Sequence, residues 1–124
     1  MSMTQLHTVV EMPEFRSRAR RRMSDFERLS LINYLAANPL AGEKMVGTGG
    51  ARKVRWAVGG SGKSGGIRAI TFYSGPDVPV FLLTLFGKGE KSNITRAEAK
   101  ALKAVLGAII EEYKKTSKAK GKGR

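Results

Sequence analysis

The chain contains no cysteine, which excludes disulfide bonds, thiol catalysis and cysteine-ligated zinc. Its single histidine is His7, and no surrounding motif supports a Ser-His-Asp triad. No apolar run reaches the length of a bilayer span, and the N-terminus has no apolar segment of the signal-peptide kind. We therefore expect a cytoplasmic protein without a membrane partner, a metal ion or a cofactor.

Acidic residues are also scarce: 10 Asp and Glu stand against 23 Lys and Arg, which gives a net charge of +13 over 124 residues. An excess of this size favours a polyanionic partner such as nucleic acid, the ribosome or an acidic protein. Part of the excess is terminal, because residues 114–124 contain Lys and Arg but no acid. The length predicts a single domain over residues 1–113, followed by a basic, disordered tail over residues 114–124.

Two helices are predicted near the N-terminus, after a short strand at residues 4–11. The first helix spans residues 13–22, and its arginines form either a solvated face or a binding surface. Ser24 and Glu27 have the spacing of a capping box, which starts a second helix that Asn38-Pro39 ends. The apolar stripe of the second helix consists of Leu29, Ile32, Leu35 and Ala36. The arginines of the first are Arg16, Arg18, Arg20, Arg21 and Arg22.

Three strands are predicted in the middle of the chain, at residues 52–58, 67–73 and 78–86. In the first of them, apolar residues alternate with Lys53 and Arg55, so these two cations share the face opposite the apolar set. The third is a nearly continuous apolar run, which is typical of a strand covered on both faces. The segment between residues 40 and 51 is rich in glycine and is predicted to be a loop.

The glycine-rich segment AVGGSGKSGG (57–66) has the spacing of a relaxed phosphate-binding loop, with four residues between Ala57 and Gly62-Lys63-Ser64. Such a loop needs a helix after it, because the helix N-terminus supplies the N–H groups that hold the phosphate. Here a β-branched and aromatic segment follows instead, so the glycines form the tip of a β-hairpin. Lys63 is then a cation at this tip, placed to contact RNA.

The last helix is predicted to start at a second capping box, formed by Thr95 and Glu98. The element order is β-α-α-β-β-β-α. This order indicates an α+β domain, in which a small antiparallel sheet is accompanied by two N-terminal helices and a C-terminal helix. The apolar stripe of the last helix consists of Leu102, Val105, Leu106, Ile109, Ile110 and Tyr113.

Cations dominate the chemistry of the predicted sheet. Lys53 and Arg55 share one strand face, and Arg68 lies on the returning strand, although parity alone leaves its side of the sheet open. An arginine can stabilise the extra negative charge of a pentavalent phosphoryl group, and a lysine among other cations has a lowered pKa that suits a base. In RNA the attacking group can be the adjacent 2′-hydroxyl, so neither a metal ion nor a histidine is required. The same cations also suit phosphate binding without cleavage.

Three segments together resemble the RelE/ParE superfamily of type II toxins, and within it the RelE/HigB-like branch. The segments are RKVRW (52–56), GKSGGIR (62–68) and LFGKGEKSN (85–93), and the resemblance covers residues 24–110. It implies a microbial-RNase-like fold and an mRNA endonuclease that acts in the ribosomal A site and leaves a 2′,3′-cyclic phosphate. It also implies three partners: the ribosome, mRNA and a cognate antitoxin, often a helix-turn-helix, HigA-like protein.

The resemblance assigns roles to individual positions. Lys53 is the candidate base or phosphate stabiliser, Arg55 is a second strand cation, and Arg68 is the candidate stabiliser of the transition state. Lys88 and Lys91 are implied to contact phosphate or ribosomal RNA.

Two positions depart from the family pattern. Gly89 stands where some RelE nucleases carry an arginine, and Thr95 stands where they carry a tyrosine that stacks on a base. Tyr73 is the nearest alternative aromatic. The general acid and base therefore stay open, as do two other functions: inhibition of DNA gyrase, as in ParE-like relatives, and RNA binding without catalysis.

Overall fold

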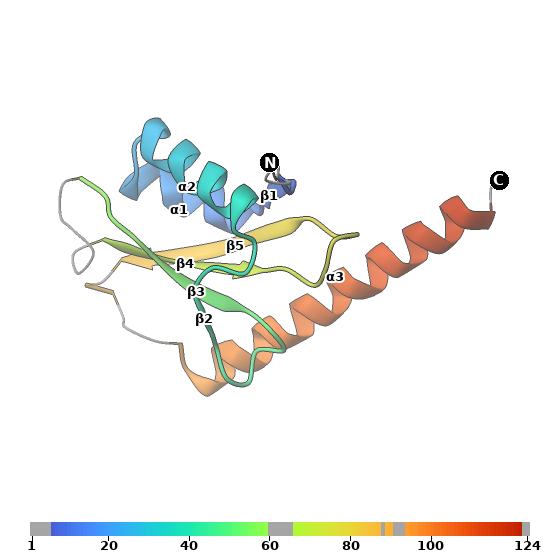
Figure 1. Cartoon of the computed structure of the whole chain (residues 1–124). Helices are drawn as coiled ribbons and strands as arrows, with labels where there is room; N and C mark the ends of the chain where they lie inside the picture. Colours follow the sequence, from blue (N-terminus) through green and yellow to red (C-terminus); the bar gives the residue numbers. More distant parts are fainter. Residues whose placement is uncertain (1–5, 60–65, 88, 91–93, 123–124) are drawn as a thin grey trace.

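The structure, a computed structural model, describes residues 6–59, 66–87, 89–90 and 94–122 (Figure 1). Helices α1 and α2 cover one face of a sheet, and α3 lies along the other. This arrangement confirms the expected α+β class. The elements in chain order are β1 (Val9–Glu11), α1 (Pro13–Arg22), α2 (Asp25–Ala37), β2 (Glu43–Lys44), β3 (Arg52–Trp56), β4 (Ile67–Phe72), β5 (Val80–Gly87) and α3 (Arg96–Lys122).

The sheet has the order β1-β5-β4-β3-β2 within the described residues. Strands β2 to β5 form an antiparallel meander, but β1 pairs with β5 in parallel, with Val9 opposite Val80. The expectation of a purely antiparallel sheet is therefore wrong. After β1 the chain crosses one face of the sheet through α1 and α2 and joins the opposite edge as β2, which leaves β1 beside β5. The two-residue strand β2 lies in the segment predicted as a loop, where it is too short to show a period.

The face covered by α1 and α2 holds the larger part of the core. Phe15 from α1 and Leu31 and Leu35 from α2 are fully buried against strand residues such as Val54 and Leu85. Leu29, which the sequence places in the stripe of α2, is instead 51% exposed. It lies two residues, or about 200° around the helix, from Leu31, so the two side chains point to opposite sides.

The second face packs against α3. Leu106 is fully buried, and other residues of the predicted stripe are half-buried against Ile70, Phe81 and Phe86 of the sheet. Val105 is more exposed than predicted, at 46%. The helix continues to Lys122, beyond the residue where the sequence predicts a tail, and alanine and lysine in this segment are good helix formers. No helix among the described residues is long and apolar enough to cross a membrane.

Both predicted capping boxes are present. The Ser24 hydroxyl accepts from the Glu27 amide, and the Glu27 carboxylate accepts from the Ser24 amide; Thr95 and Glu98 repeat the arrangement. The Glu27 carboxylate also accepts from the Gly59 amide, beyond β3. These backbone hydrogen bonds, from Ser24 and then from Gly59, hold the pKa of Glu27 below its ordinary value. The start of α2 is thereby tied to the β3–β4 connection.

Candidate functional site

The β3–β4 pairing brings the three predicted catalytic cations onto one face of the sheet. Arg55 lies directly opposite Arg68, and Lys53 lies opposite Ile70. Directly opposed residues of antiparallel strands point to the same face, and Ile70 belongs to the core on the α3 side. Lys53, Arg55 and Arg68 therefore share the α3 side, which fixes the orientation of Arg68 that the sequence leaves open. We call these three residues the cation cluster.

Arg68 is the unusual member of the cation cluster. It is only 7% exposed, between Arg55 on one neighbouring strand and Phe86 on the other. Its Nη1 atom is buried and has no hydrogen-bond partner in the described part of the chain. A buried donor without a partner costs free energy, and a like charge directly opposite adds to that cost. Buried polar groups without a partner are concentrated at functional sites, which makes Arg68 the strongest candidate for a functional residue in the cation cluster.

Lys53 lines a pocket of about 250 Å³ between β2, β3 and the start of α3, which we call the hollow. Lys44 and Arg96 line the same hollow, together with the carboxylate-bearing Glu43. The first turn of α3 also lies there, and unpaired amides at a helix N-terminus favour anions. Sequence reasoning missed Lys44 and Arg96. Arg96 follows the capping residue directly, which is the signal that points to it.

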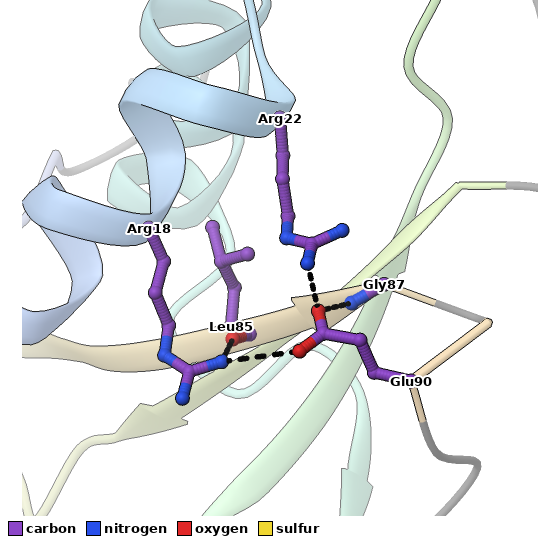
Figure 2. Close-up of polar contacts among 5 residues, drawn as sticks. All are labelled: Arg18, Arg22, Leu85, Gly87 and Glu90. Carbon is purple, nitrogen blue, oxygen red and sulfur yellow. Dashed lines mark hydrogen bonds and ion pairs between the residues drawn. The ribbon is translucent and has the colours of Figure 1, made fainter.

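An ion-pair clasp holds the turn that follows β5 (Figure 2). The Glu90 carboxylate contacts Arg18 Nη1 at 3.5 Å and Arg22 Nη2 at 2.5 Å, and it accepts a hydrogen bond of 2.8 Å from the Gly87 amide. Arg18 Nη1 also donates to the Leu85 carbonyl at 3.3 Å. Two of the five arginines predicted as a solvated face or a binding surface thus have partners inside the molecule.

Replacing Glu90 by glutamine is expected to lower the free energy of unfolding by about 1 kcal/mol, because the clasp is about one-third exposed and such ion pairs are weak. The difference should shrink in high salt. Urea unfolding at two salt concentrations measures it. Glu111→Gln, at an exposed glutamate of α3, is the matched control. Equal losses in the two variants would show that the clasp does not stabilise the fold.

The structure does not bring Tyr73 to the cation cluster. Its ring packs at the edge of the core on the α1–α2 side, where its hydroxyl lies 3.4 Å from Nδ1 of His7. The predicted RNA-binding residues Lys63, Lys88 and Lys91 lie outside the described residues. No group of three His, Cys, Asp or Glu side chains in the described ranges is placed to hold a metal ion.

The comparison with known families places these features in context. A family model described as the RelE toxin of the RelE/RelB toxin–antitoxin system matches residues 15–121. The match spans most of the chain and contains the cation cluster, the hollow at Lys53 and the clasp. The chain therefore belongs to the RelE toxin family, and it is the toxin of a toxin–antitoxin pair whose partner is an antitoxin.

Proposed function

We propose that this protein is a ribosome-dependent mRNA endonuclease that uses the 2′-hydroxyl of its substrate as the nucleophile and needs no metal ion. The observation that carries the proposal is Arg68, a buried arginine with an unpartnered nitrogen on the same face as Lys53 and Arg55. Dependence on the ribosome, and pairing with a helix-turn-helix antitoxin, are proposed from the resemblance to the RelE/HigB-like branch.

The proposed reaction needs few protein groups. The 2′-oxygen attacks the adjacent phosphorus while Lys53, acting as the base, takes the 2′-hydroxyl proton. Arg68 donates to the phosphoryl oxygens as negative charge accumulates on them. The bond from phosphorus to the 5′-oxygen then breaks, and this oxygen takes up a proton from solvent water. The products are a 2′,3′-cyclic phosphate and a 5′-hydroxyl end. Arg55, exposed beside Arg68, holds the neighbouring phosphate as a charged donor.

Mapping of message 5′ ends after induced expression tests this proposal. We expect new ends within translated codons, carrying a 5′-hydroxyl, and we expect them to disappear in a Lys53→Ala, Arg68→Ala variant. A Lys114→Ala, Lys115→Ala variant removes the same charge from exposed positions of α3 and should keep the cuts.

Two outcomes would contradict the nuclease. Growth arrest with intact messages and a DNA-damage response would instead indicate inhibition of DNA gyrase. Expression without growth arrest and without new message ends would indicate a protein that binds RNA and does not cleave it.

A further inference from the structure

A groove of about 520 Å³ runs between α2 and β3, on the side of the sheet away from α3. Its apolar lining includes three aromatic residues: Phe26 and Tyr34 from α2, and Trp56 from β3. Phe26 is 80% exposed and Tyr34 is 41% exposed. The Tyr34 ring lies against Trp56, with 5.2 Å between centroids and 44° between ring planes. Exposed aromatic side chains gathered in one groove mark a binding site for an apolar or aromatic partner.

The groove and the cation cluster lie on opposite faces of the sheet and meet at the edge of β3, where Arg55, paired with Arg68 on the α3 side, also lines the groove. This is possible because the β2–β3 ladder ends at the pair of Glu43 and Lys53. No strand of the described chain covers the edge of β3 beyond that pair. An exposed arginine at this edge can therefore contact a ligand that continues from the cation cluster into the groove.

Polar groups of the groove match the edge of a base. The Glu27 carboxylate, already accepting from the Ser24 and Gly59 amides, keeps acceptor capacity for an amino group. Its negative charge disfavours a phosphate inside the groove, whereas Arg55 favours one at the rim. Aromatic surface with an acceptor inside and a cation at the rim is the arrangement that a nucleotide requires.

We propose that the groove binds a base of single-stranded RNA, stacked on Phe26 and the Tyr34–Trp56 pair, with its phosphate at Arg55. This inference rests on the proposed function, because it places one nucleotide of the substrate beside the phosphate at the cation cluster. The occupant is RNA rather than an apolar peptide because the chain carries a net charge of +13 and the rim is an arginine shared with the cation cluster. Stacking itself tolerates every base, since each has a π-face, whereas the Glu27 acceptor favours a base that carries an amino group.

Fluorescence provides the test, because Trp56 is the only tryptophan of the chain. The probe is a 2′-O-methylated RNA decamer, which cannot be cleaved by 2′-hydroxyl attack, offered to the full chain as a single strand or as a duplex. We expect the single strand to quench Trp56 with saturation and the duplex to quench it little. Phe26→Ala and Tyr34→Ala should each weaken binding by about tenfold.

Leu29→Ala is the matched control, since Leu29 is an exposed apolar residue of α2 that does not line the groove. It should leave both the quenching and the affinity unchanged. Absence of quenching, or unchanged affinity in both aromatic variants, would overturn the groove as a base site. Loss of affinity for the antitoxin alone in these variants would overturn it too, by assigning the groove to a protein partner. Because the probe cannot be cleaved, quenching without any message cleavage in cells would contradict only the nuclease.

Discussion

Replacement of Arg68 by methionine is expected to reduce RNA cleavage by about 10²–10³-fold and at the same time to stabilise the fold. The loss follows if Arg68 donates to the phosphoryl group, because removal of one such donor has effects of about this size. The gain follows from its surroundings: Nη1 is buried without a partner, and Arg55 is a like charge directly opposite. Methionine fills similar space without a polar atom, which should raise the free energy of unfolding by about 1–3 kcal/mol.

Two measurements are needed on the same preparation: cleavage in a translation reaction with purified ribosomes, and urea unfolding. Lys114→Met serves as the control, since it removes one exposed charge from α3 and should change neither quantity appreciably. A variant that is both inactive and less stable would mean that Arg68 supports the fold, and the case for a catalytic arginine would fail. A variant that retains cleavage would remove it from the mechanism.

Replacement of Gly66 by alanine is expected to damage stability and activity together. A Cβ atom at this position would lie 2.0 Å from the Trp56 carbonyl oxygen and 2.8 Å from its carbonyl carbon. Both are backbone atoms, so the start of β4 must move away from β3. We expect a loss of about 2–3 kcal/mol in the free energy of unfolding. The same movement displaces Arg68 from Arg55, and we expect cleavage to fall by about 10²-fold.

Gly107→Ala is the contrasting variant. Gly107 lies within α3, and a Cβ atom there meets nothing within 4 Å. Alanine is the better helix former, so this change should add about 1 kcal/mol of stability and leave cleavage unaffected. Urea unfolding of both variants checks the pair of expectations. A Gly66→Ala protein as stable as the parent would contradict the close approach of β4 to the Trp56 carbonyl.

Local patterns in the sequence predict much of the fold. The two capping boxes are correct because each depends only on two residues three positions apart. The prediction that Val54 faces the core and Arg55 faces away from it is correct, because the period of a strand fixes which side chains share a face. Strand context correctly makes residues 57–66 a connection between two antiparallel strands rather than a nucleotide loop followed by a helix. The same alternation correctly places Lys53 and Arg55 on one face of the sheet.

Features that depend on distant partners are not predictable in this way. The parallel pairing of β1 is decided by which edge of the sheet is free after α1 and α2 have crossed it. The side of Arg68 depends on the register with β3, and the sequence carries no local signal for that register. The side of Tyr73, by contrast, follows from alternation: Tyr73 has the parity of Ile67 and Ala69, which lie in the α1–α2 core, and the opposite parity to Arg68. The aromatic groove combines residues of α2 and β3, which no single segment reveals.

The parallel strand β1 also sets an order of events during synthesis. Its partner β5 begins at Val80, so the ribosome must make more than half of the chain before these strands can meet. Until then α1 and α2, with Phe15 and Leu31, have no completed sheet to cover. The local β3–β4 hairpin, which carries the cation cluster, can close earlier because its loop is short. During synthesis the strands that carry the charged residues are therefore complete before β5 and α3, the elements that pack hydrophobic side chains against them.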